Sequence, residues 1–228
     1  MSDRLPQGEE KRRAVRGLFD TISPRYDLVN RVMTFGLDVG WRRTAVASLR
    51  LPGRSLVADL ACGTGDFCRE LQRRGYHAVG FDFSHGMLVN ARTEAPLVEA
   101  DVLQLPLADG RADGVTCGFA LRNVVSLGGF FRELGRIVRP GGRIALLDAS
   151  EPDNPVMRAG HGVYFNRVVP LIGGTLSNKD AYSYLPKSMA YLPGPAEMLS
   201  MLREAGFHDA ARRQLSGSIT QLLVGTRS

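Results

Sequence analysis

The sequence lacks the patterns of an exported, membrane-spanning or zinc-binding protein. It has three cysteines among 228 residues, at positions 62, 68 and 117, and they form no Cys-x-x-Cys pair. An odd cysteine count without such a pair predicts neither a disulfide framework nor a zinc ribbon. No stretch approaches about 18 consecutive apolar residues, and the N-terminus has no apolar signal core. We therefore expect a cytoplasmic protein without a membrane span or a bound metal.

A nucleic-acid-binding pattern is also missing, although the formal net charge is +6. The basic residues are scattered in short groups, for example from Lys11 to Arg16 and at Arg212 and Arg213. Without interleaved aromatic residues or a binding motif, such groups are typical of solvated helix faces. The charge also allows peripheral contact with the cytoplasmic face of an anionic membrane, and the sequence leaves a homodimer open.

What the sequence has in abundance is an alternation of strand and helix patterns. It predicts a mainly parallel sheet with helices on both faces, an α/β fold. The tail reads as two strands joined around Leu215 to Ser218, which would close the sheet with an antiparallel hairpin. We expect strands at 55–61, 76–82, 97–100, 112–120 and 141–150, and helices at 66–74, 84–92 and 126–138.

One domain accounts for a chain of this length, with 44% hydrophobic residues. Residues 1–50 carry helical patterns and are interpreted as an N-terminal helical lid on the main domain, 51–228. Residues 153–192 are rich in Tyr, Pro, Gly and Met and are interpreted as a substrate cover. The alternative for both segments is additional packing around the core.

A glycine-rich turn follows the first predicted strand, at Gly63, Thr64, Gly65 and Asp66. Such a turn lets backbone amides approach a ligand, and an acid about 20 positions on, here Asp82, accepts hydrogen bonds from ribose hydroxyls. The turn has no lysine to neutralise phosphates, which disfavours ATP and GTP. The third small residue of a dinucleotide fingerprint is replaced by a cysteine, which makes NAD and FAD less suitable. A cationic, phosphate-free nucleoside such as S-adenosylmethionine suits this turn, and a plain tight turn is the alternative.

Ligands of open parallel sheets bind at the carboxyl ends of the strands. Two polar residues, Arg122 and Asn123, lie just beyond the fourth predicted strand and would face the same crevice. The residues that would converge at this edge from the five strand ends are Gly63, Asp82, Asp101, Leu121 and Asp148.

The ordered motifs resemble those of class I S-adenosylmethionine-dependent methyltransferases, and most closely the UbiE/COQ5/MenG group. The resemblance spans roughly residues 15 to 225 and implies a Rossmann-like fold with a mainly parallel seven-stranded sheet and an antiparallel C-terminal strand. It also implies C-methylation of a small lipophilic quinol with a prenyl tail, either demethylmenaquinol or the methoxybenzoquinol of ubiquinone synthesis. The motifs that carry it are VADLACGTGD, GFDFS, EADVLQLPLADGRADGVTCGFALRNV, LGRIVRPGGRIALLDAS, FDTISPRYDLVN, GLDVGWRR and AYSYLPKSMAYLP.

The resemblance also assigns cofactor contacts and departures from the family pattern. Thr64 would lie in the glycine loop, Asp82 at the ribose, and Asp101 with Val102 beside the adenine. Gly118 stands where the family commonly has a cofactor-contacting serine, and Ala120 replaces a glycine, while DAS replaces EFS after the fifth strand. The first two departures, at Gly118 and Ala120, leave a different phenolic substrate open. The full set of predicted cofactor contacts is Gly63, Thr64, Gly65, Asp82, Phe83, Asp101, Val102 and Leu121.

Catalysis would need placement of the ring and stabilisation of the phenolate that forms when a ring hydroxyl loses its proton. We assign the electrostatic role to Arg122, because a guanidinium stays protonated, and the positioning of the ring oxygen or a water to Asn123. Asp148 is predicted as a partner or proton acceptor, and Tyr26 as a residue that closes over the sulfonium. His161 is the one histidine worth testing as a base. A natural-product methyltransferase or a non-catalytic cofactor-binding scaffold remain the alternatives.

Overall fold

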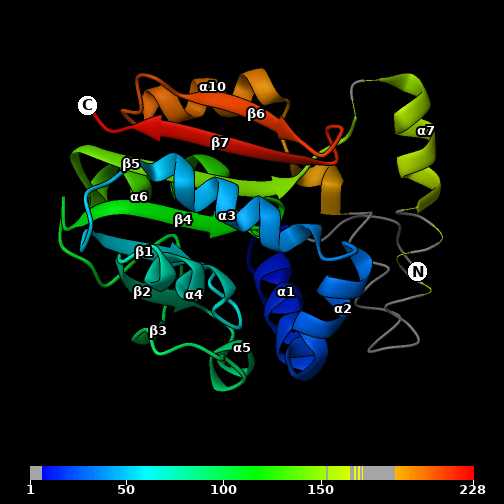
Figure 1. Ribbon diagram of the computed structural model, residues 1–228, viewed down its shortest axis with the longest axis horizontal. Coiled ribbons are helices and arrows are strands. Elements are labelled where there is room, and N and C mark those ends of the chain that lie inside the picture. The colour runs from blue at the N-terminus through cyan, green and yellow to red at the C-terminus, as the bar shows by residue number, and fades with distance from the viewer. Residues whose placement is uncertain (1–6, 153, 165–166, 168, 170, 172–187) are drawn as a thin grey trace.

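The computed structural model describes residues 7–152, 154–164, 167, 169, 171 and 188–228. Within these residues, seven strands form one sheet, which can be followed in Figure 1. Their order is β3-β2-β1-β4-β5-β7-β6, and the first five are parallel. Strand β7 runs antiparallel to both of its neighbours, so the predicted fold class and the C-terminal hairpin are confirmed. The strands are β1 Leu56–Leu60, β2 His77–Asp82, β3 Leu97–Glu99, β4 Ala112–Gly118, β5 Val138–Ala149, β6 Ala211–Leu215 and β7 Thr220–Thr226.

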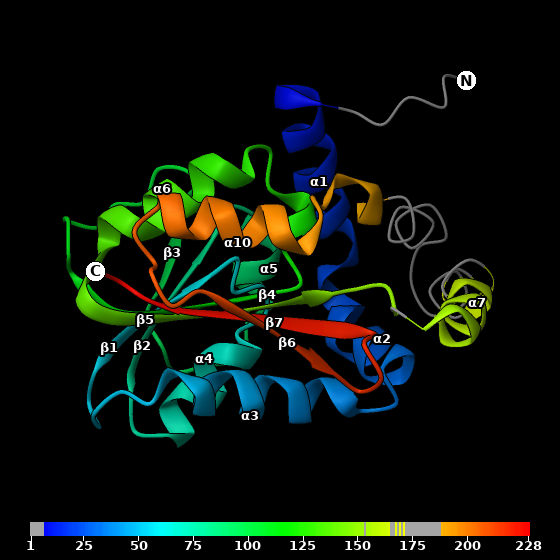
Figure 2. The same cartoon turned by 90° about the horizontal axis from the view of Figure 1, so that it is seen from above.

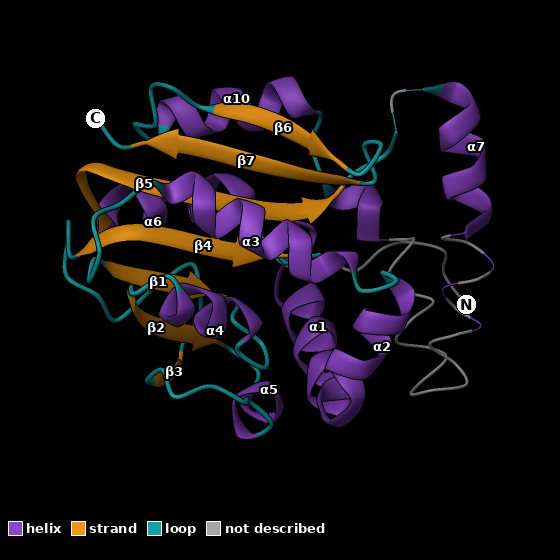
Figure 3. Ribbon diagram, viewed as in Figure 1, coloured by secondary structure: helices purple, strands orange, loops and turns teal. Residues whose placement is uncertain are grey.

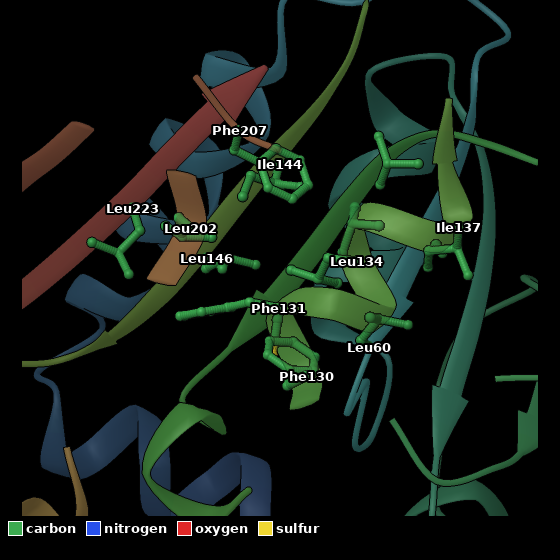
Figure 4. Close-up of a cluster of buried hydrophobic side chains, with 14 of the residues drawn as sticks. Leu60, Phe130, Phe131, Leu134, Ile137, Ile144, Leu146, Leu202, Phe207 and Leu223 are labelled. Carbon is green, nitrogen blue, oxygen red and sulfur yellow. The ribbon is translucent and has the colours of Figure 1, made fainter. Parts of the chain in front are cut away.

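Helices cover both faces of this sheet, with α3 and α4 on one side and α6 and α10 on the other (Figure 2). Helix α6 packs on the sheet because its apolar residues Phe130, Leu134 and Ile137 recur at helical spacing and form one buried face (Figure 4). The helices of these layers are α3 Leu37–Leu49, α4 Asp66–Arg73, α5 His85–Val89, α6 Leu127–Ile137 and α10 Pro195–Glu204.

The remaining helices lie beyond the carboxyl ends of the parallel strands (Figure 3). Of the described residues in the segment predicted as a lid, 1–50, those of α1, η1 and α2 lie there, whereas α3 packs its Trp41, Val46 and Leu49 side chains on the sheet. We call α1 and α2 the lid helices. The elements at this edge are α1 Gly8–Ile22, η1 Ser23–Arg25, α2 Tyr26–Met33, η2 Leu121–Asn123, α7 Pro155–Val163 and η4 Met189–Tyr191.

Several predicted boundaries differ from the observed ones for local reasons. Helix α5 ends at Val89 instead of 92, because the Arg92 amide donates to the Thr64 carbonyl at 3.0 Å and draws the chain back toward the glycine loop. Strand β4 ends at Gly118 instead of 120, because Phe119 has a φ of 59°, which ends the extended conformation although its amide still donates to the Leu147 carbonyl at 2.7 Å. Most of the predicted substrate cover, 153–192, lies outside the described residues, as does the side chain of His161.

Candidate active site

The glycine loop after β1 forms the floor of the candidate site. Gly63 and Gly65 have φ values of 55° and 84°, a region that favours glycine. The Gly65 amide donates to the Cys62 carbonyl at 2.9 Å, and α4 begins immediately afterwards. The loop therefore turns within four residues and directs the Gly63 amide toward the end of the neighbouring strand, β2.

Asp82 ends β2 and is fixed by this loop. Its two carboxylate oxygens accept hydrogen bonds at 2.8 Å from the amides of Gly63 and Ser84. Burial raises the pKa of Asp82 to about 6, although the backbone hydrogen bonds oppose that rise. At neutral pH the carboxylate is therefore ionised and ready to accept hydrogen bonds from a pair of ribose hydroxyls.

A cleft opens above this loop. Both the lid and the strand ends contribute to its wall. Seven of the twelve residues predicted for the site line it: Tyr26, Gly63, Asp82, Phe83, Asp101, Val102 and Asn123.

The other five predicted residues, Thr64, Gly65, Leu121, Arg122 and Asp148, do not line the cleft. The side chain of Thr64 is buried and donates its hydroxyl proton to Asp27 of α2. Leu121 is 2% exposed and packs into the core. These residues therefore shape the loops from behind the cleft wall.

Arg122 and Asp148 form a buried ion pair. The Asp148 carboxylate also accepts the Arg122 backbone amide at 3.3 Å, and Arg122 Nε donates to Ser188 Oγ at 3.1 Å. The positive charge of Arg122 is therefore balanced by a carboxylate behind the cleft wall. This arrangement holds η2, and with it Asn123, at the end of β4.

Asn123 presents an unsatisfied acceptor at the cleft wall. Its Oδ1 atom is buried and has no hydrogen-bond partner among the described residues. A buried acceptor without a partner is unfavourable, so a donor from a bound molecule would be stabilising there. Tyr26 lines the same cleft, and burial raises the pKa of its hydroxyl, which keeps it neutral.

The lid helices are attached to the strand ends by polar contacts that the sequence analysis missed. Lys11 was expected on a solvated face, but its side chain is buried, and its ammonium donates to the carbonyls of Arg122 and Val124 at 2.9 Å. Arg12 pairs with Asp101 at 2.9 Å. No local pattern could reveal the Lys11 contacts, because the partners are 111 and 113 positions apart.

A second lid attachment lies at the start of α5. Asp20 Oδ1 accepts hydrogen bonds from Ser84 Oγ at 2.6 Å and from the Gly86 amide at 3.0 Å. Between these attachments, the α1 side chains Val15 and Phe19 line the cleft. The lid thus provides an apolar wall opposite the sheet.

The departure at Gly118 has a steric explanation. A Cβ atom at this position would lie 2.5 Å from Cε2 of Phe67, well inside normal carbon contact. The Phe67 ring is buried and fills the space that a serine side chain would need. Gly118 lines the cleft, and the Phe67 ring of α4 lies behind it.

The chemistry of this wall fits S-adenosylmethionine. Two carboxylates, Asp82 and Asp101, face the cleft, and the cation that lines it, Arg12, is already paired with Asp101. Phe83 and Val102 add apolar surface for a base. Hydroxyls and a positive sulfur are favoured here, whereas phosphates are not.

The fold and this site together define a Rossmann-like methyltransferase that uses S-adenosylmethionine. The structure is similar to that of an S-adenosylmethionine-dependent methyltransferase from Thermotoga maritima, with a TM-score of 0.66 and 17% identity, covering 93% of this chain and 99% of that one. At this identity the similarity shows the fold alone.

Sequence comparison identifies the family. The profile of the ubiE/COQ5 methyltransferase family matches residues 7–227, and the chain belongs to this family. It is 40% identical to a demethylmenaquinone methyltransferase of Roseiflexus castenholzii, covering 92% of this chain and 91% of that protein. It is 38% identical to a ubiquinone/menaquinone biosynthesis C-methyltransferase UbiE of Syntrophotalea carbinolica, covering 93% and 94%.

Proposed function

We propose that this protein transfers a methyl group from S-adenosylmethionine to a ring carbon of a lipophilic quinol, converting demethylmenaquinol to menaquinol. The names of its relatives support this acceptor, and the family supports the reaction class. The observation that carries the proposal is the unsatisfied side-chain oxygen of Asn123, Oδ1. Asn123 and Asp82 line the same cleft. A ring hydroxyl can therefore be held near the nucleoside pocket.

In this proposal the cleft residues divide into two groups. Gly63, Asp82, Phe83, Asp101 and Val102 hold the nucleoside, whose bound sulfonium supplies an activated methyl group. Holding donor and acceptor in line can supply much of the rate, with effective molarities on the order of 10⁵ M. The protein therefore needs placement more than a strong base.

The second group acts on the quinol. Asn123 Oδ1 accepts the hydrogen bond of a ring hydroxyl, which enriches the ring in electrons as that hydroxyl loses its proton to water. A bond forms between the methyl carbon and the ring carbon, the sulfur–carbon bond breaks, and the ring proton leaves to restore the aromatic ring. Tyr26 closes the cleft from the lid side as a neutral hydroxyl.

Arg122 is a positioning residue in this proposal. Its pair with Asp148 orients η2 and therefore the Asn123 carbonyl. Arg122→Lys should lower kcat while the affinity for S-adenosylmethionine stays the same, because the nucleoside contacts lie elsewhere in the cleft. A matched fall in both quantities would contradict this role.

Asn123 variants test the proposed acceptor contact directly. Asn123→Leu preserves the volume but removes the acceptor, and kcat should fall by roughly 10²-fold. Asn123→Asp keeps an acceptor oxygen and should retain more activity than Asn123→Leu. The control is the affinity for S-adenosylmethionine, which should not change in either variant, and equal activity of the two variants would count against the contact.

The acceptor itself is tested with three purified compounds and radiolabelled S-adenosylmethionine. Short-chain demethylmenaquinol should be methylated fastest, and a simple catechol should remain unlabelled. The third compound, a methoxybenzoquinol precursor of ubiquinone, is the second candidate acceptor because relatives carry the joint ubiquinone/menaquinone name. Transfer to the catechol alone would reject the proposal in favour of a natural-product enzyme. Bound cofactor without transfer to any of them would favour a scaffold.

Because the proposed substrate is a lipid, we further propose that the protein works at the cytoplasmic membrane face.

A further inference from the structure

An unusual group of exposed apolar side chains lies on lid helix α2 and in the turn that leads from it into α3. Leu28, Val32, Phe35 and Leu37 are 57%, 40%, 78% and 45% exposed, and we call them the α2 patch. They are four of the seven large hydrophobic residues that are exposed in the described part of the chain, and they lie within ten consecutive positions. Single exposed apolar residues are ordinary, whereas a cluster marks an interaction surface.

Helix α2 has a broad apolar face, only part of which is buried. Its inner residues Tyr26, Val29 and Met33 belong to a cluster with α1 and α5. Leu28 and Val32, four positions apart, lie on the flank of this inner face and are exposed. The polar residues Asp27, Asn30 and Arg31 occupy the remaining side, so α2 has one broad apolar face whose flank at Leu28 and Val32 is left exposed.

The position of Phe35 strengthens this argument. The helix ends in a Schellman arrangement, in which the Gly36 amide donates to the Arg31 carbonyl at 2.9 Å and the Phe35 amide to the Val32 carbonyl at 3.2 Å. Phe35 occupies the left-handed position of this motif with a φ of 50°, where glycine or asparagine is unstrained. The Phe35 ring lies 6.1 Å from the Tyr164 ring, centroid to centroid, yet remains 78% exposed, so most of its surface is available for a further contact.

The charges around the patch select the partner. From Thr21 to Leu37 the one acidic residue is Asp27, and its carboxylate accepts the Thr64 hydroxyl. Arg25, directly before α2, is exposed, and Arg31 is 40% exposed while pairing with acids on its inner side. Apolar side chains bordered by arginines complement a bilayer surface with anionic headgroups.

We propose that the α2 patch docks this protein on an anionic lipid bilayer, with Phe35 and Leu28 inserted among the headgroups. No helix among the described residues is long and apolar enough to cross a membrane, so the contact is made by side chains at the surface. The inference rests on the proposed function, because a prenylated quinol resides in the bilayer. Tyr26, on the inner side of the same helix, lines the cleft, so the substrate would enter about one helix diameter, roughly 10 Å, from the bilayer.

Vesicle co-sedimentation tests the docking surface. The wild-type chain should bind phosphatidylglycerol vesicles more tightly than phosphatidylcholine vesicles, and more weakly as salt is raised. The double variant Leu28→Gln/Phe35→Asn should bind phosphatidylglycerol vesicles at least about tenfold more weakly than the wild type. Asparagine suits the left-handed position, so the variant should fold at least as well, as checked by its Tm. The matched control is Val89→Gln on α5, which removes a 68% exposed apolar side chain outside the patch and should bind like the wild type.

Methylation assays separate this inference from the proposed function. The double variant should methylate a water-soluble short-chain quinol at the wild-type rate and lose about tenfold with a long-chain quinol in vesicles. Wild-type methylation without vesicle binding would overturn the docking inference alone. Vesicle binding that depends on the patch, without methylation of any quinol, would support docking and reject the function. If the variant instead converts a dimer to a monomer in sedimentation velocity and the wild type ignores vesicles, the patch is a surface between two copies.

Discussion

Adding a single methyl group at Gly118 should destabilise this protein unless the Phe67 ring is reduced at the same time. The β carbon of Gly118→Ala would lie 2.5 Å and 3.0 Å from two carbons of that ring, whereas carbon atoms pack at about 3.5 to 4.0 Å. Gly118 does not have a positive φ, so the backbone itself accepts alanine. The steric conflict with Phe67 is therefore the expected source of the loss.

The magnitude follows from the packing of the ring. Phe67 is 4% exposed and lies within the core between α3 and the sheet, so it cannot move away freely. Overpacking of this kind lowers the free energy of unfolding by about 1 to 3 kcal/mol. Phe67→Leu alone should lose about 1 to 2 kcal/mol of packing, including the contact with the Arg42 guanidinium at 6.0 Å.

Urea unfolding of the wild type, both single variants and the double variant provides the assay. In the double variant the shorter side chain leaves room for the added methyl, so its loss should match that of Phe67→Leu alone. The coupling energy between the positions should then be about 1 to 3 kcal/mol, since residues in contact are not additive. Losses that add to within about 0.5 kcal/mol would refute the steric explanation of Gly118.

Three further predictions concern charged groups. Asp82→Asn should weaken binding of S-adenosylmethionine by about 10- to 100-fold in calorimetry; wild-type affinity should fall as the pH drops through about 6, where Asp82 gains a proton, and the variant should lack this pH dependence. Lys11→Met leaves the carbonyls of Arg122 and Val124 without their donor, so it should cost about 1 to 3 kcal/mol and speed hydrogen exchange in α1 but not in the sheet; unchanged exchange in α1 would contradict the attachment. Burial raises the pKa of Asp59 from 3.8 to about 7. Between about pH 4 and pH 7, Asp59 is therefore protonated in the folded state and ionised in the unfolded state. The free energy of unfolding should fall by up to about 4 kcal/mol as the pH rises through that window. Asp59→Asn should remove this fall in urea unfolding at pH 5 and pH 8, and an equal fall in the variant would count against it.

The sequence was sufficient for the features that depend on local patterns. Alternating strands and helices predicted the sheet, and the spacing from Gly63 to Asp82 predicted two groups that the structure joins at 2.8 Å. Element ends were less predictable, since α5 stops where the Arg92 amide finds a distant carbonyl. Local periodicity carries no information on such partners.

The parts of the site that the sequence analysis missed depend on contacts between distant residues. Lys11 was placed on a solvated face because its run of basic neighbours resembles one, yet two carbonyls near η2 bury its ammonium. Arg122 was expected to face the crevice, but it does not line the cleft and instead pairs behind the wall with Asp148, the residue predicted as a partner or proton acceptor. The steric relation between Gly118 and Phe67 likewise required coordinates.

The most direct test of the proposed function is methyl transfer from labelled S-adenosylmethionine to short-chain demethylmenaquinone, with the reduced and oxidised forms compared in parallel. The account predicts transfer to the reduced form alone, with the label on a ring carbon, because the Asn123 acceptor needs a hydroxyl proton and the ring must be electron-rich. Equal transfer to the oxidised form, or label on oxygen, would contradict it.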